Sequence, residues 1–263
     1  PGAPSGYGDP LGALPLREAI CDYVRRSRSV NCTPQQILIT AGTQQGLYLA
    51  AQILLDAGNS AWVEDPAYAG ITALFNSLFR DRHMIRVPVA NDGIDVAAGV
   101  RLAADARAAF VTPSHQYPLG MPMSMAKRSA LLAWAKERQA WIVEDDYDSE
   151  MRYAGHPFPS LQGLAPERTL YLGTFSKVLF PSLRLAYLIV PPALVEPFVT
   201  ARTVYDGHSA QLMQAITAEF IRQGHFAAHI RYMRQLYHSR RDVLLTEVRE
   251  KLGHFATPAP AAG

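Results

Sequence analysis

The chain has 263 residues, of which 49% are hydrophobic and 18% charged, and its formal net charge at pH 7 is +2. This length and apolar content suit one large domain or two unequal ones with a sizeable core. The small net charge argues against a broad nucleic-acid surface, and no apolar run approaches the roughly 18 residues of a membrane span. The two cysteines, Cys21 and Cys32, form no disulfide framework, and Cys21 is predicted to be a reduced cytosolic thiol used for packing.

Short apolar segments that read as strands alternate with helical patterns along most of the chain. This alternation predicts an α/β fold in which seven strands form a mostly parallel sheet with helices on both faces. Beyond residue 192 the pattern is helical, with a long segment from about 225 to 250 and a Pro/Ala-rich end, "TPAPAAG". In chain order the predicted elements are a helix at 13–28, a strand at 37–40, a helix at 41–55, a strand at 61–65, a helix at 68–79, strands at 83–89 and 108–112, a helix at 124–139, and strands at 140–145, 169–173 and 185–190.

Polar residues follow several of these strands, at the positions where ligands bind in parallel α/β sheets. Gly42, Thr43 and Gln44 stand at a strand-to-helix turn. Backbone N–H groups at such a turn bind anions, although Gly and Thr also serve simply as turn and cap. Tyr68 follows the strand at 61–65 and either packs in the next helix or presents its ring to a site.

Two later loops carry further candidates. Prolines flank His115 and Gln116 in "TPSHQYPLG", which makes this loop stiff. Lys177 follows the segment Thr174-Phe175-Ser176, and Arg184 comes seven residues later at the start of the last strand. A lone lysine in such a loop is usually solvated, whereas an amine beside several strand ends is typical of a Schiff-base site.

The acidic segment at 144–150, "EDDYDSE", could bind Mg²⁺ or supply a carboxylate pair for acid–base catalysis. Asp145 ends an apolar strand, where a buried carboxylate needs a cation as its partner. A positively charged heterocycle would serve as that cation equally well. Strand alternation predicts that Asp146 faces away from Asp145. His225 and His229 have the spacing of two zinc ligands on one helix face, but no third ligand stands out. A further basic cluster, Arg25, Arg26 and Arg28, is interpreted as a solvated helix face.

A Schiff-base lysine, an anion cup, an arginine, a buried aspartate and a stacking aromatic ring together match the requirements of pyridoxal phosphate. The segment "GTFSK…PSLRLAY" resembles the lysine loop of fold type I aminotransferases. The segments "VEDDYDSEMRYAG", "PSHQYPLG", "TAGTQQGL" and "GYGDPLGALPLREAI" and the tail "GHFAAHIRYMRQLYHSRRDVL" resemble one branch of that fold. This branch is the aminotransferase-like domain of MocR-type regulators, which pair it with a GntR-type winged helix.

The resemblance covers nearly the whole chain. It implies a large domain of the fold type I pyridoxal-phosphate-dependent transferases over residues 1–205, with a mostly parallel seven-stranded sheet flanked by helices. Residues 206–263 would form a helical linker and the start of a truncated C-terminal small domain. The arginine that clamps a substrate carboxylate in such small domains has no candidate here and is expected beyond the C-terminus.

The resemblance also implies a role for each site residue. Lys177 would form the internal aldimine, and Asp145 would pair with the pyridinium nitrogen. Tyr147 would donate a hydrogen bond to the phenolic oxygen of the ring, and Tyr68 would stack on the ring face. The residues implied to bind the phosphate are Gly42, Thr43, Gln44, Ser176 and Arg184.

Three further positions are implied with other partners. His115 and Gln116 would stand beside the ring, where many aminotransferases carry an Asn-Pro pair. Tyr7 resembles the tyrosine that reaches the phosphate of a neighbouring subunit, so a homodimer is implied. At Gly70 some relatives carry an arginine implicated in ligand recognition, and this chain lacks it.

Two functions are compatible with this resemblance. In the first, the chain is the effector-sensing half of a MocR/GntR-type transcription regulator and forms aldimines with an amino-compound ligand. DNA would then be bound only through an N-terminal winged helix that is absent from this chain. In the second, it is a free-standing class I/II aminotransferase that exchanges an amino group between an amino acid and a 2-oxo acid. The "EDDYDSE" segment and the tail motif favour the regulator, and either protein is expected in the cytoplasm.

Overall fold

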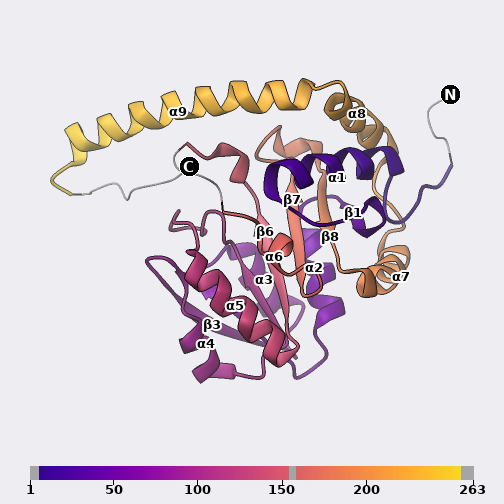
Figure 1. Cartoon of the computed structure of the whole chain (residues 1–263), viewed down its shortest axis with the longest axis horizontal. Helices are drawn as coiled ribbons and strands as arrows, with labels where there is room; N and C mark the ends of the chain where they lie inside the picture. Colours follow the sequence, from indigo (N-terminus) through magenta and orange to yellow (C-terminus); the bar gives the residue numbers. More distant parts are fainter. Residues whose placement is uncertain (1–5, 154–157, 256–263) are drawn as a thin grey trace.

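The computed structural model describes residues 6–153 and 158–255 of the chain (Figure 1). The Pro/Ala-rich end at 257–263, singled out in the sequence, lies outside these residues. In the described part of the chain, no helix has both the length and the apolar character needed to cross a membrane.

All seven predicted strands are present and join one sheet. A further strand of two residues, which the sequence pattern did not indicate, pairs with the end of the third strand and brings the described sheet to eight. The strands are β1 Ile37–Thr40, β2 Ser60–Asp65, β3 His83–Ala90, β4 Gly93–Ile94, β5 Ala108–Val111, β6 Trp141–Asp146, β7 Thr169–Thr174 and β8 Ala186–Ile189.

The sheet is mixed but mostly parallel, in the order β1-β8-β7-β6-β5-β2-β3-β4. Strands β3, β2, β5, β6 and β7 run parallel to their neighbours in this series. Strand β8 is antiparallel to both β1 and β7, so β1 and β7 point the same way. The carboxyl ends of β1, β2, β5, β6 and β7 therefore meet at one edge of the sheet, and β8 begins there.

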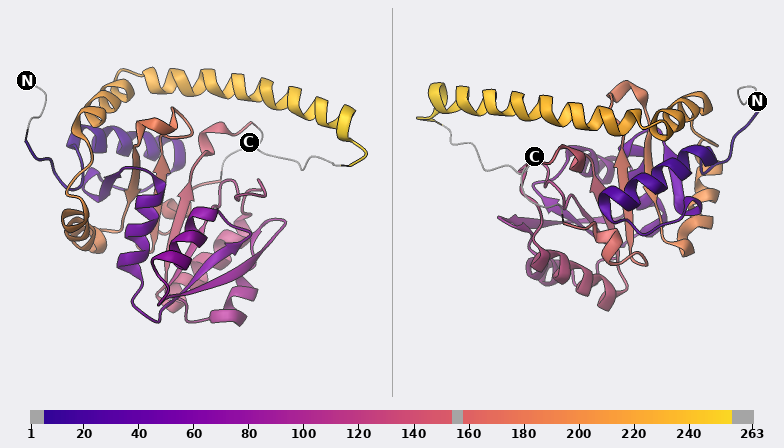
Figure 2. Two further views of the ribbon diagram at one scale, coloured as in Figure 1. Left: turned by 180° about the vertical axis from the view of Figure 1, so that it is seen from behind. Right: turned by 45° about the horizontal axis from the view of Figure 1, so that its top comes forward.

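Helices cover both faces of the sheet (Figures 1 and 2). One face packs against α2 Thr43–Leu54, α3 Ala69–Ser77 and α7 Val195–Tyr205. Two groups of helices share the opposite face. The first group is α1 Leu14–Arg28, α8 Gln211–Arg222 and α9 His225–Leu252. The second group is α4 Val96–Ala103, α5 Met125–Arg138 and α6 Leu161–Leu164. Short 3₁₀ helices lie at Pro34–Gln36, Ser149–Met151, Pro181–Leu183 and Pro192–Leu194.

The core follows from strand alternation, because successive side chains of a strand point to opposite faces. In β8, Leu188 packs toward α2, whereas Tyr187 and Ile189 pack toward α1. Cys21 of α1 belongs to the same apolar cluster as Tyr187 and Ile189. It is 1% exposed, which confirms its predicted packing role.

The C-terminal helices begin within the same core. Ala218 of α8 and Phe226 and Ile230 of α9 join the apolar cluster of α1, while the rest of α9 runs on past the sheet (Figures 1 and 2). The division of the chain at residue 205 stays a prediction.

Candidate functional site

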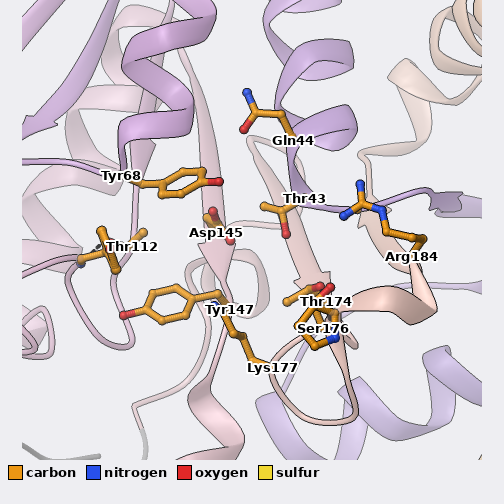
Figure 3. Close-up of a pocket in the computed structure, with 13 residues that line it drawn as sticks. Thr43, Gln44, Tyr68, Thr112, Asp145, Tyr147, Thr174, Ser176, Lys177 and Arg184 are labelled. Carbon is orange, nitrogen blue, oxygen red and sulfur yellow. Dashed lines mark hydrogen bonds between the residues drawn. The ribbon is translucent and has the colours of Figure 1, made fainter.

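A pocket of about 300 Å³ lies where the strand ends meet (Figure 3). Chain segments far apart in sequence form it, because the parallel topology brings their ends to one edge. The predicted site residues that line it are Gly42, Thr43, Gln44, Tyr68, Asp145, Tyr147, Ser176, Lys177 and Arg184. The structure does not place Tyr7, His115 or Gln116 among its lining residues.

One end of the pocket is built to receive an anion. Helix α2 begins at Thr43, and no N-cap side chain accepts from its first N–H groups; Gly42, Thr43 and Gln44 at this helix start line the pocket. The guanidinium of Arg184 packs directly against Gly42, since a Cβ added at Gly42 would lie 2.9 Å from Arg184 Nη2. Gly42 has φ +144°, and Arg184 itself is left-handed with φ 53°. Backbone conformations with positive φ are adopted most easily by glycine. In proteins generally, other residues with such conformations are concentrated at functional sites.

The other side of the pocket holds a carboxylate without a cation. In the view of Figure 3, Asp145 lies between the rings of Tyr68 and Tyr147, away from Arg184. Within the described residues, the Asp145 carboxylate makes no hydrogen bond or ion pair with another side chain or the backbone. Burial, followed by the charges of Asp146, Asp148 and Glu64, raises the pKa of Asp145 to about 8. A cation at this position would remove that penalty.

Lys177 lies on the rim of the same pocket. It occupies the turn after β7, and its side chain is exposed toward the pocket space. The turn is held by the Ser176 N–H, which donates to Thr174 Oγ1 at 3.1 Å, and by the Leu179 N–H, which donates to the Phe175 carbonyl at 2.8 Å. An amine is thus held beside an anion cup and a lone carboxylate.

Asp146 faces away from the pocket, as strand alternation predicted. Its carboxylate accepts hydrogen bonds at Oδ2 from Arg28 Nε at 2.8 Å, Tyr171 Oη at 2.7 Å and Ser149 Oγ at 2.8 Å. Arg28 is only 6% exposed, so the interpretation of its cluster as a solvated face was wrong for this residue. Arg25 and Arg26 are exposed, because the helix turns only Arg28 toward the sheet.

The other carboxylates of 144–150 also bind protein donors. Glu144 accepts the N–H groups of Leu161 and Gln162 at 3.0 Å, which secures the start of α6. Glu150 accepts the Tyr23 hydroxyl at 2.7 Å, and Asp148 is 2.8 Å from His115 Nδ1. No group of three His, Cys, Asp or Glu side chains among the described residues is arranged to hold a metal ion.

The histidine pair of the long helix is occupied by other contacts. His225 Nε2 lies 3.0 Å from the Gln223 side-chain oxygen, and His229 Nε2 lies 2.9 Å from the Val178 carbonyl. His229 thereby connects α9 to the turn that carries Lys177.

His115 and Gln116 lie behind the pocket wall. Both are buried, and Gln116 Nε2 donates to Glu64 and to the carbonyls of Pro66 and Tyr117. Their contacts brace the loop that supplies Tyr117 to the pocket, and a direct contact with a bound ring stays a prediction.

Tyr7 lies apart from the pocket of its own chain. It is fully exposed, and its ring makes an edge contact with His208 at a centroid distance of 6.2 Å. Its predicted contact with a neighbouring subunit remains untested by this arrangement.

Several lining residues were missed in the sequence. Thr112, Tyr117, Thr174 and Pro181 line the pocket and lie inside or beside the segments singled out for other residues. Their proximity to strand ends was the available signal, but Thr and Pro at such positions are also ordinary turn residues.

The sequence profile described as aminotransferase class I and II matches residues 2–263. The chain is 41% identical over 253 residues to the probable rhizopine catabolism regulatory protein MocR of Rhizobium meliloti, covering 96% of this chain and 50% of that protein. It is 42% identical over 251 residues to the uncharacterized HTH-type transcriptional regulator YhdI of Bacillus subtilis, covering 94% of this chain and 52% of that protein. The chain thus spans about half the length of these curated relatives.

A solved structure gives the same fold. LysN, an α-aminoadipate aminotransferase from Thermus thermophilus complexed with N-(5'-phosphopyridoxyl)-L-leucine, superposes with a TM-score of 0.88 at 28% identity. The superposition covers 98% of this chain and 66% of that one. It confirms the fold class predicted from the sequence.

Proposed function

The chain belongs to the aminotransferase class I and II family, and on this premise we propose that it is the effector-sensing, pyridoxal-phosphate-binding domain of a MocR-type transcriptional regulator. The observation that carries the proposal is the lone Asp145 carboxylate in a pocket that also holds an arginine-lined anion cup and the amine of Lys177. This set of groups fits a phosphorylated cationic heterocycle with an aldehyde.

Different residues of the pocket would bind different parts of this cofactor. Pyridoxal phosphate supplies an aldehyde that condenses with amines and a ring that withdraws electrons. The Asp145 carboxylate would hold the proton on the ring nitrogen through a charge-assisted hydrogen bond worth about 1.5–3 kcal/mol. Tyr147 would donate to the phenolic oxygen, and Tyr68 would cover one ring face. The phosphate would be bound by Gly42, Thr43, Gln44, Ser176 and Arg184.

The sensor function is supported by the curated relatives, which are named as regulatory proteins. In this proposal an amino compound is captured in the pocket in place of Lys177, and a winged helix outside this chain contacts DNA. The protein would act as a cytoplasmic homodimer, with Tyr7 reaching the pocket of the other subunit. Residues 1–205 would form the cofactor-binding domain, and residues 206–263 the linker and the start of a small domain.

The alternative is a free-standing aminotransferase. It is favoured by the fold match to LysN and by the exposed Lys177 amine, which would move a proton between the substrate carbon and the cofactor. A sensor needs to keep its ligand so that it can shift a conformational equilibrium, whereas an enzyme must release product.

Turnover separates the two functions. We expect the full-length protein, loaded with pyridoxal phosphate, to change its absorbance spectrum on addition of one class of amino compound. The same compound should alter affinity for operator DNA by about fivefold or more, as a typical coupling free energy gives. With common 2-oxo acids added, chromatography should detect no sustained formation of new amino acid. Repeated turnover at about 1 per second or faster would establish the aminotransferase instead.

Gly70 sets the position of the Tyr68 ring. A Cβ added at Gly70 would lie 2.1 Å from Tyr68 Cε1 and 2.4 Å from Gln44 Oε1, whose amide also donates to the Gly70 carbonyl. Gly70→Ala should therefore displace the ring and weaken cofactor binding by up to about tenfold, the value of one stacking contact. Fluorescence titration with the cofactor measures the loss.

The double variant Gly70→Ala/Tyr68→Ala provides the control. If both changes act through the same ring, the double variant should bind the cofactor no more weakly than Tyr68→Ala alone. Additive losses would show that Gly70 acts elsewhere.

A further inference from the structure

A second buried carboxylate, Glu64 of β2, lies beside the pocket and was not anticipated in the sequence. It is 2% exposed. Its Oε2 accepts the Thr112 N–H at 3.1 Å, the Thr112 hydroxyl at 2.7 Å and Gln116 Nε2 at 3.2 Å. All three donors are neutral, and Oε1 has no hydrogen-bond partner within the described residues.

Glu64 and Asp145 share one small space. Together with Thr112 and Tyr68 they line a cavity of about 20 Å³, which is large enough for one water molecule. Asp145, Thr112 and Tyr68 also line the main pocket. Glu64 and Asp145 thus border the same small cavity at the floor of the site.

Glu64 is also the uncompensated charge near Asp145. Three carboxylates disfavour ionisation of Asp145, namely Asp146, Asp148 and Glu64. Asp146 is paired with a buried arginine, and Asp148 is hydrogen-bonded to an imidazole. Burial raises the pKa of Glu64 to about 7, and among the causes that raise the pKa of Asp145 its charge ranks after burial, Asp146 and Asp148. The other titratable side chains lining the pocket around Asp145 are Tyr68, Tyr117, Tyr147, Lys177 and Arg184.

We propose, on the basis of the function proposed above, that Glu64 adds to the burial that keeps a proton on Asp145 in the empty pocket and thereby weakens the hold on the cofactor near neutral pH. When a protonated ring enters, the O–H bond of the Asp145 carboxyl breaks, and one proton leaves to solvent. The ring N–H then donates to the resulting carboxylate. Glu64 touches no cofactor and acts through Asp145, so it is a positioning residue.

Glu64→Gln is the informative variant. A glutamine oxygen can still accept from the Thr112 N–H and hydroxyl, while the negative charge is removed. Because the pKa of Asp145 is raised to about 8, its protonation weakens cofactor binding to the wild-type protein roughly elevenfold at about pH 7. If loss of the charge lowers the pKa of Asp145 by about one unit, that factor falls to about twofold.

Pyridoxamine 5'-phosphate is the probe, because it does not condense with Lys177. Glu64→Gln should bind it about fivefold more tightly than wild type near pH 7, and the ratio should fall toward one near pH 9. Glu150→Gln is the matched control. Burial also raises the pKa of Glu150 to about 7, and Glu150 is not among the charges that act on Asp145. A glutamine at this position still accepts the hydrogen bond from the Tyr23 hydroxyl. The affinity of Glu150→Gln should equal that of wild type.

Equal or weaker binding by Glu64→Gln near pH 7, with the same ratio near pH 9, would overturn the inference and leave Glu64 as a brace for the loop. Infrared spectroscopy of the empty wild-type protein gives an independent test. It should show a protonated carboxyl band near pH 7 that Asp145→Asn removes, and its absence would also overturn the inference. A wild-type protein that binds no pyridoxamine 5'-phosphate would refute the proposed function, while the infrared band still decides the state of Asp145.

Discussion

Protein carrying Lys177→Ala will retain no cofactor after borohydride reduction and denaturation, whereas wild-type protein treated in the same way will carry pyridoxal phosphate on Lys177. The reason is covalent, because borohydride fixes an aldehyde only where an amine has condensed with it. Lys177 is the lysine that lines the pocket, and three others, Lys127, Lys136 and Lys251, lie elsewhere in the chain. Peptide mass spectrometry of the reduced protein therefore assigns the adduct to one of four positions.

Lys136→Ala is the control, because this lysine is exposed on α5, away from the pocket lining. It should carry the adduct on Lys177 as wild type does. An adduct on another lysine in the wild-type protein, or an undiminished adduct in Lys177→Ala, would refute the assignment of Lys177.

Arg28→Met will lower the free energy of unfolding by about 3–5 kcal/mol near neutral pH, because it leaves a buried charge without its partner. Arg28 Nε lies 2.8 Å from Asp146 Oδ2, and the same guanidinium donates to Ser114 Oγ at 2.7 Å. The Asp146 side chain has no solvent exposure. Denaturant unfolding of both proteins measures the difference.

The pH dependence of this loss has a definite sign. In the wild-type protein Arg28 is the main influence that opposes burial and holds the pKa of Asp146 below its ordinary value. The pair therefore contributes its full stability above the ordinary aspartate pKa and loses it as the pH falls through the folded value. The deficit of Arg28→Met should thus be largest near neutral pH and shrink on acidification.

A second substitution tests the mechanism. Asp146→Asn in the Arg28→Met background removes the uncompensated charge and should recover part of the lost stability. Asp146→Asn alone should destabilise, since it also breaks the pair. If the double variant is less stable than both single variants, the ion pair is not the source of the effect.

The strands and most helices could be predicted because each is a local pattern. Apolar runs such as "ILIT" and "AWIV" form buried strands wherever they fall in a parallel sheet. Helix α4 was missed because its sequence, "VAAGVRLA", is short and dominated by small residues, and its start depends on the Asp95 side chain, which accepts the Ala98 N–H at 3.0 Å. The two-residue strand β4 is too short to show the alternation of apolar and polar residues that indicates a strand.

The sequence by itself determined the residues at the strand ends, Lys177, Arg184, Asp145 and the turn at Gly42, because strand direction alone brings them to one edge. Only the tertiary structure decided what surrounds them. Arg28 and Asp146 are 118 residues apart, and the sequence indicated only a solvated helix face for Arg28 and a position facing away from Asp145 for Asp146, yet the fold buries them as an ion pair. Glu64 reads as the end of a strand, and its place beside Asp145 depends on the order of β2, β5 and β6. Pairing and desolvation of charges are set by distances through space, which sequence spacing does not encode.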